Sequence, residues 1–332
     1  MEVLGVAIAT ILLFVLYGGM VGVVFGFFGM GSFLVTPALI VMGYDSRVVV
    51  GSGLAFVFGT AVIGTLRHRD FGQVDYRLGV VLIAGTVFGI EIGKRAVLLL
   101  EAVGVASLVV ASTYVVLLSA IGAFVVLEAR GTPMGRRVPV PSWLNRPRER
   151  LWSLWPRMDL REGETVSALV VFGVAVIAGV LSGFLGVGGG FLRMPALTYL
   201  FGMSLPVAVG TNIFAVMFSG AFGSFTWAQV GGVDLSVVVP LLVGSAMGAR
   251  IGSALTRLVD DDEMKLHFGS LLIAAAVAVA ARQTGELLGI GPLRTVSLAV
   301  LVAAATVVSG LVVYSGVTAL RARPSDRAAR AD

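Results

Sequence analysis

Two similar stretches decide the fold of this chain: residues 26–39 read GFFGMGSFLVTPAL and residues 183–197 read GFLGVGGGFLRMPAL. In both stretches, glycines interrupt an apolar run and a proline follows a few residues later. Glycine permits backbone conformations with positive φ, and a proline near the beginning of a helix removes no helical hydrogen bond. Each stretch therefore predicts a long helix that ends at the glycines and a short helix that begins just after them.

The sequence around these stretches has the composition of a membrane protein. Of its 332 residues, 57% are hydrophobic and 13% are charged, against roughly 45–50% and 25% in ordinary soluble domains. No Asp, Glu, Lys or Arg occurs from Val3 to Tyr44. As one helix, this run would be about 60 Å long, about twice the hydrocarbon thickness of a bilayer. We therefore expect an all-α polytopic integral membrane protein in which this run is divided into a full span and a shorter piece.

The same composition excludes several other classes. The apolar runs are continuous, unlike the alternating segments of a β-barrel. The chain has no cysteine, which excludes disulfides, thiolate metal sites and a catalytic cysteine, and we expect neither a metal nor a cofactor. The basic pI of about 10.0 comes from clustered arginines, which beside so many apolar runs indicate membrane topology rather than nucleic-acid binding.

The two halves of the chain align with each other as an internal duplication. Beyond the glycine stretches, a constant shift of 159 residues places Ser52 on Thr211, Asp75 on Asp234, and GTVFGIEIG at 85–93 on GSAMGARIG at 244–252. We therefore expect two homologous transmembrane repeats, residues 1–127 and 166–285, and one additional helix within residues 286–320. Together they make about nine full spans and two short helices. The expected segments are 3–27, 33–42, 47–66, 77–97, 103–127, 166–185, 191–201, 206–227, 235–255, 265–281 and 293–320.

The basic residues indicate how the repeats are oriented. Residues 128–165 contain eight arginines and five prolines, which predicts an extramembrane linker on the cytoplasmic side. Arginines also occur around the loop between residues 67 and 77 and in the tail 321–332, whereas the equivalent second-half loop, residues 228–232, has no basic residue. Equivalent loops of opposite character belong on opposite sides of the membrane. We therefore expect inverted-topology repeats in the inner (plasma) membrane, with a cytoplasmic C-terminus.

The two glycine breaks are the expected binding site. Broken helices at equivalent positions of two repeats are typical of transporter sites, and the beginning of a helix attracts anions. The alternative is that these glycines only allow helices to pack closely. The candidate residues at the breaks are Gly29, Gly31, Ser32, Pro37, Gly186, Gly188, Gly189, Gly190 and Pro195.

Four further residues are candidate ligands of a small anion. Arg193 is the one charged residue between Glu164 and Asp234, and a basic side chain inside a membrane is costly unless it is paired or faces water. Its equivalent is Val35, so the duplication does not require a charge here. We expect Arg193 to contact the substrate; the alternative is that it extends to the lipid headgroups. Ser52, Thr211 and Asn212 lie at the beginning of the helices after the breaks. They either coordinate the anion, or they cap helices or bond to a carbonyl group one turn earlier.

Glu91 and Arg250 occupy equivalent positions in the two glycine-spaced blocks. Equivalent residues of inverted repeats can meet near the pseudo-twofold axis, so we expect an ion pair between them. The alternative for Glu91 is a role in gating or in proton transfer.

These motifs, with VAVGTN at 207–212 and GGVDL at 231–235, resemble those of the sulfite exporter TauE/SafE family, also called the 4-toluene sulfonate uptake permeases. The resemblance extends from about Val3 to Ala281. It implies secondary transport of a small sulfur-containing anion, such as sulfite or an organosulfonate, with the glycine-proline motifs at the two breaks. The first break, GMGS, departs from the family's GGG, and the arginine-rich linker also departs from the family pattern.

The expected function is therefore an exporter or permease that works by alternating access, and not an enzyme. Its expected partners are the anion and membrane lipids, and the sequence is compatible with a coupling proton or sodium ion and with a homodimer. One alternative is a passive anion channel. A less favoured one is an intramembrane serine protease using Ser52 with His68 or His267, which the duplication disfavours because it repeats the hydroxyl but no histidine.

Overall fold

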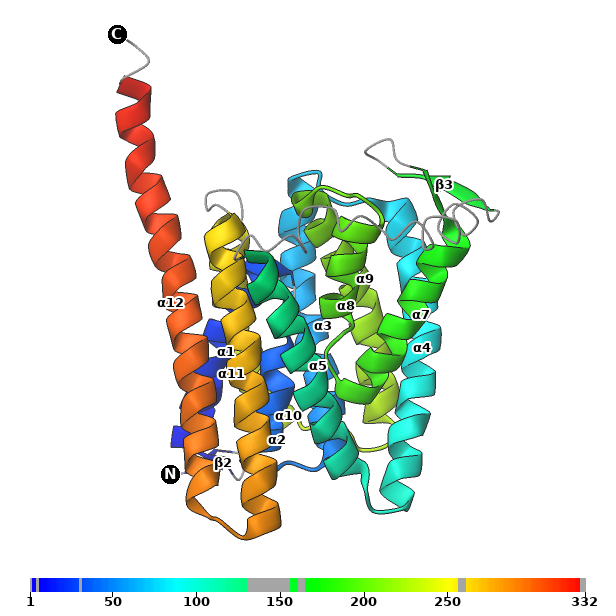
Figure 1. The fold of residues 1–332 in the computed structure, drawn as a ribbon, viewed down its shortest axis with the longest axis vertical. Coiled ribbons are helices and arrows are strands. Elements are labelled where there is room, and N and C mark those ends of the chain that lie inside the picture. Colours follow the sequence, from blue (N-terminus) through cyan, green and yellow to red (C-terminus); the bar gives the residue numbers. More distant parts are fainter. Residues whose placement is uncertain are drawn as a thin grey trace.

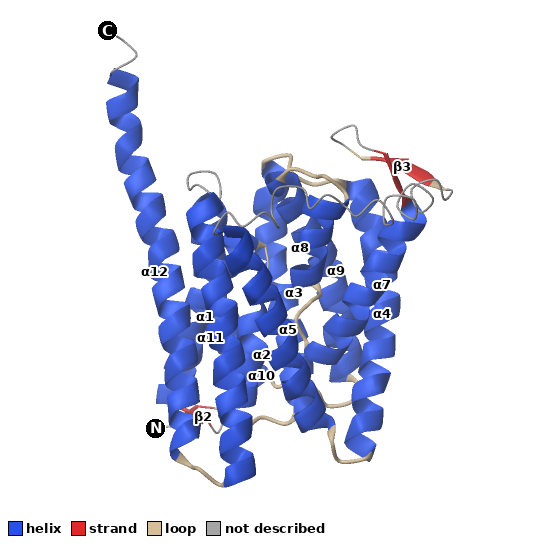
Figure 2. Ribbon diagram, viewed as in Figure 1, coloured by secondary structure: helices blue, strands red, loops and turns tan. Residues whose placement is uncertain are grey.

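The protein is a single bundle of long, roughly parallel and antiparallel helices (Figures 1 and 2). The computed structural model describes residues 2–3, 6–29, 32–129, 156–160, 165–255 and 261–328. Within these ranges, nine helices are long and apolar enough to cross a membrane. The expected all-α polytopic membrane architecture is confirmed.

The helices follow one another in a similar order in the two halves. The first half contains α1 (Ile8–Phe28), the short 3-10 helix η1 (Ser32–Leu34), α2 (Val35–Met42), α3 (Ser46–Asp70), α4 (Tyr76–Ala102) and α5 (Ala106–Ala129). The second half contains α7 (Ala168–Leu185), α8 (Gly190–Pro195), η2 (Ala196–Leu200), α9 (Leu205–Ala228), α10 (Leu235–Leu255) and α11 (Asp261–Leu288), and α12 (Pro292–Ala328) follows. Two small antiparallel hairpins pair β1 (Glu2–Val3) with β2 (Val6–Ala7) and β3 (Arg157–Asp159) with β4 (Thr165–Ser167).

Several boundaries differ from those expected. The helices α1 and α7 begin later than predicted because the residues before them pair as strands. At the other end, α12 continues through most of the predicted tail and projects beyond the bundle (Figure 1). Its arginines do not end it, since arginine is a good helix former. Most of the expected linker, residues 130–155 and 161–164, lies outside the described residues.

The first long helix of each half packs on the third long helix of the other half, α1 on α10 and α7 on α4. Glycines make both contacts close. A Cβ added at Gly22 of α1 would lie 2.7 Å from the Cα of Ser245, and one added at Gly183 of α7 would lie 2.3 Å from the carbonyl oxygen of Ile90. Small residues let the helix backbones approach in this way. The glycine-spaced blocks are therefore packing surfaces between the halves.

The helices α3 and α9 pack side by side and run antiparallel. Near the beginning of α3, Ser52 Oγ accepts a 2.9 Å hydrogen bond from the backbone N–H of Asp234, which follows α9. Near the beginning of α9, Thr211 Oγ1 accepts a 2.9 Å bond from the N–H of Asp75, which follows α3. The shift of 159 residues relates the two bonds to each other. Antiparallel equivalent helices are what inverted repeats require, and their orientation in a membrane stays a prediction.

Three of the segments that the charge pattern assigned to one side of the membrane lie at the same end of the bundle. In Figure 1 the α3–α4 connection, the β3 hairpin and the end of α12 all lie at the top. The connection between α9 and α10 begins where α3 begins, at the opposite end, because Gly232 contacts the backbone of Arg47. The loop without a basic residue thus lies at the opposite end from these three segments, although that end also carries Arg47.

Candidate functional site

Glycines with positive φ end α1 and α7 at the two breaks. After α1, Gly29 has a φ of 70°, and after α7, Gly186, Gly188 and Gly189 have φ values of 77°, 69° and 70°. Side chains are strained in this region of backbone space, so the sharp turns depend on glycine. Of the first-break candidates, Gly31 lies outside the described residues, and Ser32 begins η1.

Two buried tyrosines of the first half hold the backbone at the breaks. Tyr17 Oη donates a 2.9 Å hydrogen bond to the carbonyl oxygen of Leu34, at the end of η1. Tyr114 Oη donates a 2.5 Å bond to the carbonyl oxygen of Leu185, the last residue of α7. Carbonyl groups at the end of a helix lack intrahelical partners, so the Tyr114 hydroxyl satisfies a group of α7 that would otherwise be orphaned. The backbone of both breaks is thereby fixed from α1 and α5.

The two breaks meet at Asn212 of α9. The Nδ2 atom of Asn212 donates a 3.1 Å hydrogen bond to the carbonyl oxygen of Gly29. A Cβ added at Gly190, where α8 begins, would lie 3.0 Å from that Nδ2 atom and 3.4 Å from the same carbonyl oxygen. Residues from the first break, the second break and α9 therefore lie close together, and their role as a binding site stays a prediction.

Arg193 is fully buried and folds back over the second break. Its Nη2 donates a 2.6 Å hydrogen bond to the carbonyl oxygen of Gly188, and its Nη1 donates a 3.1 Å bond to Oγ1 of Thr86 in α4. Its Nε has no hydrogen-bond partner, and among the described residues Arg193 forms no ion pair. The guanidinium therefore lies in the protein interior with neutral partners only.

The proline and hydroxyl candidates hold structural positions. Pro37 lies in the first turn of α2, and Pro195 is the last residue of α8, which continues directly into η2. Ser52 and Thr211 bond to the backbone of the loops before α10 and α4. Each hydroxyl thus accepts a bond from the other half of the chain, a contact that the sequence had not predicted.

The expected ion pair between Glu91 and Arg250 does not form. Instead, Oε1 of Glu91 accepts a 2.9 Å bond from Nε of Arg95, one turn further along α4. The reason is the packing: α4 lies against α7 and α10 lies against α1. Each glycine-spaced helix, α4 or α10, packs against the first helix of the other half. Glu91 and Arg250 are therefore not brought into contact.

Sequence reasoning missed Thr86, which lies inside the block interpreted as packing alone. Its hydroxyl accepts the bond from Arg193 and donates a 2.6 Å bond to the carbonyl oxygen of Leu82. The available signal was a hydroxyl at the same place in both repeats, since Ser245 is its equivalent. Ser245 Oγ lies 2.9 Å from Oγ1 of Thr60 in α3, so hydroxyls on both glycine-spaced helices reach across to other elements.

The residues considered for a serine protease are not brought together. Ser52 and His68 stand on the same helix, about 24 Å apart along its axis. The hydroxyl of Ser52 accepts the bond from Asp234, and Nδ1 of His68 lies 2.8 Å from Oε1 of Gln73. The side chain of His267 lies outside the described residues. A nucleophile and its base need direct contact, so the described residues provide no pair of this kind for Ser52.

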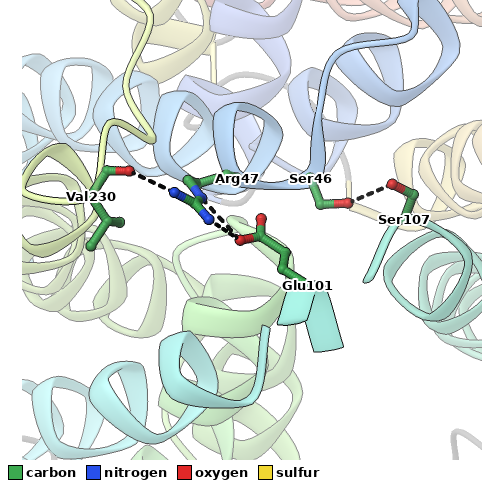
Figure 3. A network of polar contacts seen from close by, with 5 residues as sticks. All are labelled: Ser46, Arg47, Glu101, Ser107 and Val230. Carbon is green, nitrogen blue, oxygen red and sulfur yellow. Dashed lines mark hydrogen bonds and ion pairs between the residues drawn. The ribbon is translucent and has the colours of Figure 1, made fainter. Parts of the chain in front are cut away.

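A polar network joins the two halves at the end of the bundle where α3 begins (Figure 3). Nε of Arg47 donates a 2.9 Å bond to Oε2 of Glu101, and its Nη1 donates a 3.3 Å bond to the carbonyl oxygen of Val230. Ser46 and Ser107 are bonded beside it at 3.1 Å. The second-half equivalent of Arg47 is Pro206, which has no side-chain donor, so the same network cannot form at the other end.

A family model and curated relatives both match most of this chain. The model of the family described as sulfite exporter TauE/SafE matches residues 14–279, which include both breaks, Arg193 and Asn212. A probable membrane transporter protein of Xylella fastidiosa (strain 9a5c) is 26% identical over 81% of this chain and 95% of its own length. The probable membrane transporter protein YjnA of Bacillus subtilis (strain 168) is 26% identical over 79% of this chain and 97% of its own length. No solved structure matches the chain.

Proposed function

The chain belongs to the sulfite exporter TauE/SafE family and is a membrane transporter, and from this premise we propose that it carries a small anion, such as sulfite or an organosulfonate, bound at Arg193. The observation that carries this proposal is the burial of Arg193 without a counterion. Thr86 and Gly188 each accept one of its bonds, and its Nε–H has no acceptor.

The electrostatics of Arg193 favour an anion over the other roles of a buried arginine. An unpaired charge inside a protein is destabilising by several kcal/mol, so buried arginines are normally paired. Arginine also presents its N–H groups in a planar fork that matches the oxygens of an oxyanion. The Nε–H of Arg193 is buried without an acceptor, and in the proposed complex an oxygen of the anion accepts from it. An oxyanion placed there supplies both the missing charge and the missing acceptor.

The paired contacts at the two ends of α3 and α9 suggest how access alternates. At one end lie the Ser52–Asp234 bond and the Arg47 network, and at the other lies the Thr211–Asp75 bond. Transporters built from repeats expose a fixed site by moving one part of the molecule against another. In the proposed cycle, the anion at Arg193 is reached from one side when the first set separates and from the other side when the second does.

We further propose the orientation that the charge pattern predicts, in an inner membrane with the β3 hairpin and the end of α12 in the cytoplasm. Because the chain has no cysteine, single cysteines report orientation cleanly. Cysteines introduced as Asp70→Cys and Gln229→Cys, both at exposed positions, should react with an impermeant maleimide from opposite faces of the cell membrane. Labelling from the same face would contradict this orientation.

The central test is anion flux in proteoliposomes. Arg193→Gln, which removes the charge, should abolish uptake of sulfite and of small sulfonates, while Arg250→Gln, which removes an exposed arginine from α10, should transport normally. Uptake against a concentration gradient, driven by a proton or sodium gradient, would distinguish a coupled transporter from a passive channel. Full flux in Arg193→Gln would disprove the role of Arg193.

A further inference from the structure

We infer that Asn212 recognises a hydrogen-bond donor on the transported anion, so that the site prefers anions bearing a hydroxyl, amino or acidic proton to anions that offer acceptors alone. This inference rests on the proposed function. It concerns the amide oxygen of Asn212, which the packing of the breaks leaves without a partner.

The orientation of the Asn212 amide follows from its neighbour. The carbonyl oxygen of Gly29 can only accept a hydrogen bond, so the amide nitrogen of Asn212 must face it, and their 3.1 Å contact fits this. The amide oxygen, Oδ1, must then point away from Gly29. Asn212 is fully buried, and Oδ1 has no hydrogen-bond partner. A buried acceptor left without a donor is costly, and most such groups in proteins are satisfied.

The other repeat shows that packing does not require this amide. The first-half equivalent of Asn212 is Gly53. A Cβ added at Gly53 would lie 2.7 Å from the carbonyl oxygen of Gly186, which is the equivalent of Gly29. The first half therefore closes the same contact with no side chain at all. Asn212 adds a polar group that the fold can do without, and its free oxygen calls for another explanation.

The surroundings favour a donor on an anion over a bound cation. Gly188 accepts the bond from Arg193, and Gly190, two residues later, lies against the amide of Asn212. A sodium ion at Oδ1 would be repelled by the nearby unpaired guanidinium. In the inferred complex, the oxygens of the anion accept from Nε of Arg193 while its O–H or N–H donates to Oδ1 of Asn212, so that both buried groups without a partner are satisfied.

The test compares isosteric sulfonates by calorimetry on the purified full-length protein. Isethionate differs from 1-propanesulfonate, and hydroxymethanesulfonate from ethanesulfonate, by a hydroxyl in place of a methyl group. In the unmodified protein, each hydroxylated anion should bind about tenfold more tightly than its partner, the value of one hydrogen bond to an otherwise unsatisfied buried acceptor. In Asn212→Ala this ratio should fall to about one. The control Ser219→Ala, whose hydroxyl bonds within its own helix, should retain it.

Each other outcome has a defined meaning. Equal affinities within both pairs in the unmodified protein overturn the inference, whether or not Asn212→Ala folds, and so does a preference that survives in Asn212→Ala. Sodium-dependent binding of 1-propanesulfonate that is lost in Asn212→Ala would assign Oδ1 to a cation instead. If the alkanesulfonates bind and Arg193→Gln abolishes this, the proposed function stands regardless of the ratio. If none of the four sulfonates binds, the inference about Asn212 fails, whereas the proposed function is then decided by whether sulfite binds and whether Arg193→Gln abolishes that binding.

Discussion

The two glycine breaks share a backbone device but differ in chemistry. Both follow a long helix and use glycine at positive φ, at Gly29 and at Gly186. Beyond this, the first break has Val35 where the second has Arg193. The second break therefore holds a buried cation, and the first has only an apolar side chain at the equivalent position. The comparison teaches that a duplicated scaffold can hold a site whose charged group comes from one repeat.

The packing between the halves is symmetric by contrast. The Ser52–Asp234 bond has its counterpart in Thr211–Asp75, and both measure 2.9 Å. The glycine contacts of α1 with α10 also have their counterparts between α7 and α4. Changes at equivalent packing positions should therefore have equal effects in the two halves, whereas changes at equivalent positions of the breaks should have unequal effects.

The largest effect is expected from Arg193→Val, which gives the second break the side chain of the first. Anion flux in proteoliposomes should fall by about a hundredfold or more, because losing one partner of a buried charge pair costs about 2–5 kcal/mol. Thermal stability should not fall, since an unpaired buried charge is itself destabilising. Adding Val35→Arg should not restore flux. A double variant that transports normally would show that the two breaks are interchangeable.

The next effect tests the symmetric packing. Gly26→Ala and Gly183→Ala each place a Cβ 2.3 Å from a backbone oxygen of the facing helix, that of Ala249 or of Ile90. Overpacking of this kind typically costs about 1–3 kcal/mol, so both variants should unfold several degrees earlier in a thermal melt, by similar amounts. Gly173→Ala, which meets nothing within 4 Å, is the control. A large loss in one half only would break the symmetry inferred from the packing.

An effect of similar size, again alike in the two halves, is expected from Ser52→Ala and Thr211→Val. Each change removes the acceptor of one backbone N–H, which costs about 1–3 kcal/mol when that N–H stays buried. Both variants should lose a similar amount of thermal stability, while the affinity for the anion changes little, because these hydroxyls bond to loops and not to Arg193. A loss of anion affinity without a loss of stability would instead show that these hydroxyls take part in anion binding.

The smallest effect concerns the network present at one end only. Arg47→Gln removes an ion pair to Glu101 whose arginine side chain is 44% exposed, and exposed pairs contribute about 0.2–1 kcal/mol. Stability should change little, but a cysteine at Gln229 should react with a maleimide a few times faster if the network holds that end closed. An unchanged labelling rate would show that Arg47 does not contribute to closure.

The sequence predicted the spans and the glycine breaks because hydropathy, and the ability of glycine to adopt positive φ, are local properties of a segment. It also singled out Arg193 and Asn212, one as the sole charge in a long apolar region and one by its place after a break. It missed Thr86, which looked like part of a packing helix, and it paired Glu91 with Arg250 although Arg95 lies one turn away. Both errors concern which neighbouring helix a side chain faces. The sequence of one helix does not contain this information.

By itself, the sequence determined that this is a polytopic membrane protein of the sulfite exporter TauE/SafE family, with two broken helices and one isolated arginine. Only the tertiary structure decided what that arginine and the neighbouring amide contact. Arg193 meets Thr86 across 107 residues of sequence, and Asn212 meets Gly29 across 183. Such contacts depend on how whole helices pack against each other. That packing depends on how many small residues on two facing helices fit together. In contrast, the length of an apolar segment and its glycine content are properties of that segment alone, so the sequence shows them directly.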